Sequence, residues 1–185
     1  EFLFSAQSES FQSLLARLKQ VEKDENARGV ILLVSDTSLG RAQIEEVRAI
    51  LKRIQAAGKQ VVAHADSLSM RTYLLVSCAD RISVVPTGDV WINGIYGESP
   101  YLRGLFDKLG IKPDYETCGD YKSAAEMFMR RGPSPQAQEN LNWLMDGIFE
   151  SCLELMAEGR QVDVATARDW INEGVYTAER ARELG

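Results

Sequence analysis

Apolar and polar positions follow two alternating patterns along this chain. One has the spacing of helices, and the other has the short, unbroken apolar runs of buried strands. Between about residues 6 and 24, apolar side chains recur at helical spacing, which predicts an amphipathic helix. The unbroken apolar run at 30–34 is typical of a strand in a parallel sheet that is covered on both faces. A second helix has apolar positions from 44 to 54 and Gly58 at its end, and a second strand spans 60–65.

The same alternation continues to the end of the chain. Helices are predicted at about 69–78, 101–109, 163–173 and 177–184, and strands at 81–85 and 114–117, with a small strand and a bend between 90 and 95. A long helix begins at Ser134, because Pro135 suits a first helical turn and a strong apolar face follows. This order predicts an α/β fold with a mainly parallel sheet, organised as a core over residues 1–133 and a helical segment over 134–185.

Composition and charge argue against several classes of partner. A chain of 185 residues is one domain, or one domain with a helical appendage. Its net charge of −6 argues against a nucleic-acid surface, because phosphate binding needs clustered Lys and Arg. The sequence contains no signal peptide and no long unbroken apolar run. Because the chain starts at Glu1 rather than Met and stops at Gly185, we expect a fragment, with any targeting or membrane-spanning segment outside it.

The cysteines and acidic residues do not suggest a metal centre. Cys78, Cys118 and Cys152 are far apart and form no Cys-x-x-Cys pair, so we interpret them as reduced thiols rather than as a disulfide or a metal site. No other spacing of His, Cys, Asp or Glu is typical of metal ligands. We therefore predict no metal and no cofactor.

Two weak candidate sites lie at the ends of predicted strands. His64, Asp66, Ser67 and Ser69 suggest a catalytic triad, but His64 and Asp66 are two positions apart in a strand and point the same way, so a structural histidine is favoured. Gly40 lies in the loop after the first strand, where backbone N–H groups can form an oxyanion hole. A simple turn remains the favoured alternative for Gly40.

Lys122 is the strongest candidate for chemistry. It lies between a predicted strand and a helix start, and small residues follow it in the sequence 119–125. A lysine in an apolar pocket loses hydration, which disfavours the ammonium ion and lowers the pKa. A neutral lysine can then take the proton of a serine hydroxyl without a histidine. Most lysines are solvated surface residues, so the pattern alone does not establish this role.

The segment GDYKSAAEMF at 119–128 resembles the lysine motif of the signal peptide peptidase A family, also called protease IV. Three further segments are similar to that family: YLLVSCADRISVVPTG at 73–88, YLRGLFDKLGIKPDYETCGDYKSA at 101–124 and WINEGVYTAERARELG at 170–185. The resemblance implies a fold similar to Clp protease and the crotonases, and a Ser–Lys dyad in which Lys122 is the general base.

The sequence departs from the family pattern where the nucleophile is expected. In halves of the family that carry the catalytic serine, the short helix opens with Ser-Gly-Gly, and the matching residues here are Met70, Arg71 and Thr72. The loop after the first strand also lacks the family's Pro-Gly-Gly and keeps only Gly40. By resemblance, this chain is the first half of the long form, which gives the lysine while a second half gives the serine.

The resemblance also implies what the full protein does. It would be a membrane-associated, bacterial serine endopeptidase that degrades cleaved signal peptides, assembled as a homotetramer with dyads formed where halves meet. This fragment alone would then be inactive, and the side of the membrane stays open. Two other classes remain: a non-catalytic ClpP/crotonase-like assembly scaffold in which Lys122 only forms an ion pair, and a crotonase-type acyl-CoA enzyme, for which the sequence offers no convincing set of catalytic groups.

Overall fold

A computed structural model describes residues 10–185, so the first positions of the helix predicted from residue 6 lie outside the described part. The elements in chain order are α1 (Phe11–Lys23), β1 (Gly29–Leu33), α2 (Arg41–Ala56), β2 (Gln60–Ala65), α3 (Met70–Val76), β3 (Arg81–Val84), β4 (Asp89–Trp91), α4 (Arg103–Leu109), α5 (Glu126–Met129), α6 (Pro135–Arg160), α7 (Val164–Glu173), β5 (Val175–Thr177) and α8 (Ala178–Leu184). The predicted alternation of strands and helices is confirmed over most of this length.

The sheet is parallel, as the alternation predicts. Its strands lie in the order β1-β2-β3, with Val30 opposite Val61 and Ala63 opposite Ile82. A separate antiparallel pair joins β4 to β5, with Val90 opposite Tyr176. The strand predicted at 114–117 is wrong, because these residues have no strand beside them and the Tyr115 ring stacks instead on Phe128, with ring centroids 5.6 Å apart.

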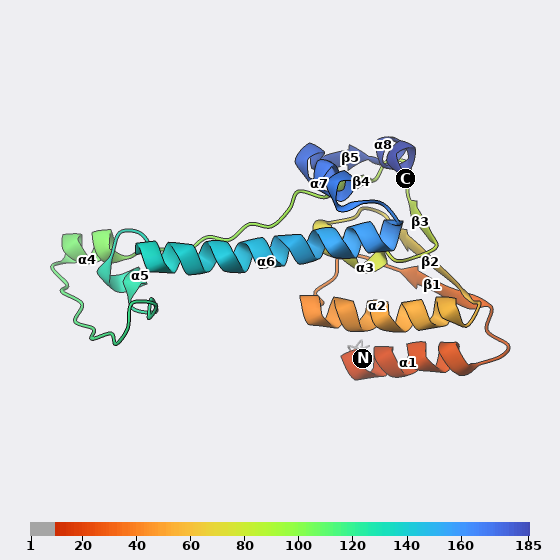
Figure 1. The fold of residues 1–185 in the computed structure, drawn as a ribbon, viewed down its shortest axis with the longest axis horizontal. Coiled ribbons are helices and arrows are strands. Elements are labelled where there is room, and N and C mark those ends of the chain that lie inside the picture. Colours follow the sequence, from red (N-terminus) through yellow and green to blue (C-terminus); the bar gives the residue numbers. More distant parts are fainter. Residues whose placement is uncertain (1–9) are drawn as a thin grey trace, which may run out of the picture. The chain divides into compact units, whose positions relative to one another are not determined.

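The core lies between this sheet and the helices on one of its faces. Apolar residues of α2 at helical spacing are buried against the sheet and α3: Ile44, Val47, Ile50, Leu51 and Ile54. Figure 1 shows α1 beside α2, which places α2 between α1 and the strands. Each buried side chain of this size contributes about 1.5–3 kcal/mol to stability, so this apolar stripe positions the loops at the strand ends.

The other face of β1 is open, which corrects the prediction of a strand covered on both faces. Ile31 and Leu33 retain 69% and 79% of their exposed surface, whereas Val30 and Leu32 are half-buried. Successive side chains of a strand point to opposite faces, and α2 covers only one of them. The apolar run of β1 therefore does not mean that the described residues cover both faces of this strand.

The chain forms two compact units. Of the described residues, one unit contains 10–94 together with Leu153–Gly185, and the other contains Ile95–Cys152. The predicted boundary at residues 133 and 134 lies inside the second unit, and the divisions in the structure follow Gly94 and Cys152 instead. No helix within residues 10–185 is both long and apolar enough to cross a bilayer.

Candidate functional site

Lys122 lies in a turn that precedes α5, in the unit Ile95–Cys152. Gly119 begins the turn with a positive φ of 98°, a conformation that suits glycine, and its carbonyl accepts the Lys122 N–H at 3.2 Å. The Lys122 side chain is exposed, and within residues 10–185 its ammonium group has neither a hydrogen bond nor an ion pair. The described residues therefore leave this ammonium group exposed to solvent.

Hydrogen bonds attach this turn and α5 to the start of α6. The Tyr121 hydroxyl donates to Glu139 Oε2 at 3.0 Å, and this carboxylate raises the pKa of the Tyr121 phenol. Glu126 Oε2 accepts the Ser134 N–H at 2.9 Å, and the Ser134 hydroxyl accepts the Ala137 N–H in the first turn of α6. The residues on both sides of Lys122 are thus held to one helix, while the ammonium group remains accessible.

Met70 occupies the first turn of α3, where the resemblance places the nucleophile. It is 8% exposed, so a thioether packs where a serine hydroxyl would have to face a substrate. The neighbouring Ser69 is the N-cap: its hydroxyl accepts the Thr72 N–H at 3.3 Å and donates to Asp36 Oδ1 at 2.9 Å. This serine is engaged in holding the helix start, which does not favour a nucleophilic role.

A cleft of about 670 Å³ lies at the carboxyl ends of β1 and β2. Its lining includes Leu33, Asp36, His64, Ser69, Asp89 and Trp91. The position agrees with the general rule that ligands of parallel α/β sheets gather at this edge. The Trp91 indole N–H donates to Asp89 at 2.7 Å, and this bond holds the pKa of the Asp89 carboxyl below its usual value.

His64 does not assemble a triad. Its Nδ1 lies 3.1 Å from the Ser83 hydroxyl on β3, and no hydrogen bond joins it to Asp66, Ser67 or Ser69 within residues 10–185. Residues at matched positions of adjacent parallel strands share a face, which is why His64 meets Ser83. The prediction of a structural histidine agrees with this arrangement.

Gly40 is the N-cap of α2. Its backbone N–H donates to the Gln43 side chain at 2.8 Å, and its φ of −68° is accessible to any residue. An amide that already has an acceptor is not free to bind an oxyanion in this conformation. The suggestion that Gly40 contributes to an oxyanion hole stays a prediction, and it requires this cap to open.

Arg48 is an important residue that the sequence reasoning missed. It is 2% exposed, and its guanidinium donates to the carbonyls of Leu74 and Leu155 and to the Ser77 hydroxyl. A signal was available, since Arg48 lies four positions after Ile44 on the buried face of α2. The residue ties α2 to α3 and to the end of α6, so its role is structural.

Lys122 lies in one compact unit, and Met70 and Gly40 lie in the other. One offers an accessible lysine in a fixed turn, and the other offers a capped helix start beside a cleft. Among the described residues, the unit that contains Met70 has no hydroxyl at the nucleophile position. The parallel sheet and the helices that flank it define the class of protein as α/β.

Comparison with known proteins gives the family. Residues 53–185 match the model of peptidase family S49, and the chain belongs to this family. It is 27% identical over 162 residues to the chloroplastic serine protease SPPA of Arabidopsis thaliana. The aligned region covers 88% of this chain and 24% of that relative. It is 30% identical over 146 residues to Protease 4 of Haemophilus influenzae, which covers 78% of this chain and 24% of the relative.

A third relative is Protease 4 of Salmonella typhi, 28% identical over 166 residues, which covers 86% of this chain and 27% of the relative. The resemblance to the signal peptide peptidase A family is therefore confirmed, and so is the fold class it implies. The chain spans about a quarter of the length of these three relatives.

Proposed function

We propose that this chain is the lysine-supplying part of a serine endopeptidase that degrades cleaved signal peptides. The observation that carries the proposal is the pairing of a family lysine motif around Lys122 with a buried methionine at position 70. A methionine has neither a proton to give nor a nucleophilic oxygen, so the serine must come from a second half of the longer protein. The family S49 match and the length of the relatives support such an arrangement.

In the proposed mechanism, Lys122 Nζ is neutral before the reaction. It takes the proton of the serine hydroxyl as the oxygen attacks the peptide carbonyl, and it returns that proton to the leaving amine. Neutrality requires burial, so the second half has to cover the turn at 119–123 when the dyad forms. The exposed ring of Tyr121 and the exposed thioether of Met129 suit such a contact because they are largely apolar.

The same proposal includes the assembly. Large apolar side chains are exposed in the unit Ile95–Cys152, among them Leu105, Leu109, Ile111, Leu141, Trp143 and Leu144. A patch of this kind is typical of a protein interface. We propose that it contributes to a homotetramer on a bacterial membrane, with the second half as the partner that brings the serine.

The test uses the full-length protein and turnover of an apolar peptide. We expect Lys122→Ala to reduce kcat on the order of 10³-fold or more, because it removes the general base. Lys112→Ala, at an exposed lysine of the same unit, is the matched control and should retain normal turnover. The sizes of both variants are measured alongside, so that a failure of assembly is recognised. Near-normal turnover of Lys122→Ala would show that the dyad assignment is wrong.

A non-catalytic scaffold is the second candidate, and the exposure of Lys122 is the observation that favours it. In a scaffold, Lys122 stays solvated or forms an ion pair, and it takes no part in proton transfer. The discriminating measurement is the pKa of Lys122 in the assembled full-length protein, obtained by NMR of a labelled lysine. A pKa depressed toward neutrality supports the dyad, and an ordinary value supports the scaffold.

A further inference from the structure

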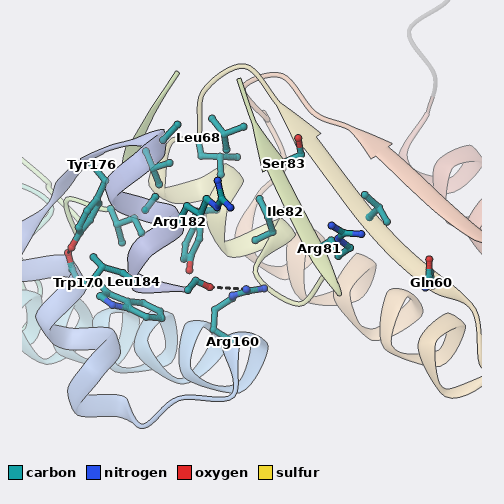
Figure 2. Close-up of a pocket in the computed structure, with 18 residues that line it drawn as sticks. Gln60, Leu68, Arg81, Ile82, Ser83, Arg160, Trp170, Tyr176, Arg182 and Leu184 are labelled. Carbon is teal, nitrogen blue, oxygen red and sulfur yellow. Dashed lines mark hydrogen bonds between the residues drawn. The ribbon is translucent and has the colours of Figure 1, made fainter. Parts of the chain in front are cut away.

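A second cavity, which shares only Leu68 with the lining of the cleft at the carboxyl ends of the strands, lies along β3. Its volume is about 690 Å³, within the range of sites that hold small ligands or short peptide segments. Apolar side chains from several elements line it: Leu68, Val90, Ile92, Trp170, Tyr176 and Leu184. Figure 2 shows Leu68, Trp170, Tyr176 and Leu184 on one side of β3, with Ile82 directed toward that side. The cavity belongs entirely to one compact unit.

The strand that borders this cavity has a free edge. Among the described residues, β3 is the outermost strand of its sheet, and β2 is its hydrogen-bonded neighbour. The opposite edge of β3 therefore presents backbone N–H and C=O groups without a strand partner. An extended peptide can bind to such an edge as an added strand, with alternate side chains in the adjoining cavity.

The charged side chains that line the cavity have one sign. Arg81, Arg160 and Arg182 contribute them, and no described lining side chain is acidic, while Gly185 lines the cavity with its main chain. Arg160 already donates to the carbonyls of Ala79 and Gly185, and Figure 2 marks the second of these bonds. By contrast, the Arg182 guanidinium has no hydrogen bond or ion pair within residues 10–185. Its neighbour on the same helix, Arg180, is paired with Glu173 and Glu183.

A buried phenol also faces the cavity. Tyr73 is 8% exposed and lines the wall, and within residues 10–185 its hydroxyl has no hydrogen-bond partner. Burial raises the pKa of Tyr73 to about 12, so the group stays a hydrogen-bond donor at any working pH. A guanidinium and a phenolic O–H are both donors to a carboxylate, and arginine binds carboxylates with paired N–H bonds.

We propose that this cavity is a binding site for the C-terminal carboxylate of an extended apolar peptide. The carboxylate accepts hydrogen bonds from Arg182 and Tyr73, the apolar side chains pack against Trp170 and Leu184, and the peptide backbone pairs with the free edge of β3. A cleaved signal peptide has a free C-terminal carboxylate, so this site would hold that substrate by its end. In this respect alone the inference rests on the proposed function.

The test measures binding rather than cleavage. Full-length protein with Lys122→Ala is titrated by calorimetry with an acetylated apolar hexapeptide that ends in a free carboxylate, and with the same peptide ending in an amide. We expect the free acid to bind roughly tenfold more tightly or better, since hydrogen bonds to a charged carboxylate are stronger than those to a neutral amide. Arg182→Gln should abolish this preference and Tyr73→Phe should reduce it, whereas Arg180→Gln should leave it unchanged.

Three outcomes overturn the inference. They are equal affinity for the acid and the amide, a preference that survives Arg182→Gln, and no binding of either peptide, which would mean that the protein's own residues fill the cavity. None of these outcomes depends on turnover, so a failure here leaves the role of Lys122 untouched. Loss of the dyad assignment would likewise leave the preference for a free carboxylate intact.

Discussion

At the scale of single residues, the structure assigns polar groups to holding the framework rather than to chemistry. Ser69, Thr72 and Asp36 form a hydrogen-bonded cap at the start of α3, and Gln43 caps the amide of Gly40. Ser69 and Asp36 line the cleft and would look catalytic if they were judged by residue type alone. Lys122, the residue with the clearest chemical prospect, has no such side-chain attachment among the described residues.

Arg48 should be the most sensitive polar position in the molecule. Replacement by alanine leaves the carbonyls of Leu74 and Leu155 without their donor and opens a cavity, and we expect a loss of about 3–5 kcal/mol in the free energy of unfolding. Lys52→Ala is the control, because its ion pair with Glu158 is partly exposed and should contribute less than about 1 kcal/mol. Denaturant unfolding measures both, and equal small losses would contradict the structural role of Arg48.

The lysine turn should loosen in acid through Glu126. Hydrogen bonds from Ser134 hold the pKa of the Glu126 carboxyl below its usual value. A depressed folded pKa contributes stability that is present above the ordinary carboxyl pKa, near 4.3, and is lost as the pH falls through the lower folded pKa. We therefore expect hydrogen exchange of the Ser134 amide and the first turn of α6 to accelerate in that acid window. In Glu126→Gln, which has no charge to lose, this acceleration should be absent.

At the scale of elements, the packing of α6 on α3 depends on one glycine. A Cβ at Gly159 would lie 2.7 Å from the backbone carbonyl oxygen of Ser77, closer than atoms can approach, whereas a Cβ at Gly147 would meet nothing within 4 Å. We expect Gly159→Ala to cost about 1–3 kcal/mol through overpacking. Gly147→Ala should instead stabilise the helix by up to about 1 kcal/mol. Thermal unfolding of the two variants decides the point, and shifts of the same sign would contradict it.

Elements were predictable where local pattern alone decides them. The periodicity of α2 and the apolar run of β2 were sufficient, because one buried stripe or one short run determines each. The strand at 114–117 failed because a strand needs a neighbour, and the sequence does not say which segments will be adjacent. The pairing of β4 with β5 escaped prediction for the same reason, since it joins segments that are far apart in the chain.

The candidate site was less predictable than the fold. The position of Lys122 before a helix followed from its motif, but its exposure depends on what covers the turn, which no spacing reveals. The engagement of Ser69 with Asp36 likewise joins two separate loops. The two open arginines beside β3 could not be recognised as a pair, because Arg81 and Arg182 are brought to one cavity only by folding.

At the scale of the whole molecule, the unit Ile95–Cys152 contains little buried apolar surface. Its ring stack of Phe106, Phe128 and Tyr115 is its main apolar cluster, and Ser134 and Cys152 are its only buried side chains among the described residues. Trp143 remains 75% exposed on α6. A unit with so little buried apolar surface has a small core of its own, so we propose that contacts in an assembly supply most of its stability.

Trp143 is therefore the position at which assembly should be most sensitive. In the full-length protein, we expect Trp143→Gln to raise the dissociation constant of the oligomer roughly tenfold or more, since buried tryptophans at interfaces commonly contribute 2 kcal/mol or more. Asn140→Ser, on an exposed position of the same helix, is the control. Sedimentation velocity over a range of concentrations provides the measurement, and identical behaviour of the two variants would remove Trp143 from any interface.

The methionine at position 70 also has an evolutionary consequence. Restoring a serine there would remove a packed thioether from α3, leave Arg71 and Thr72 where the family's flexible glycines stand, and still face a Gly40 amide bound to Gln43. Each single reversal costs stability, about 2–4 kcal/mol for the first, and restores no turnover alone. If a second half supplies the serine, as proposed above, selection could refine this chain as a partner, but no single substitution would return it to an independent enzyme.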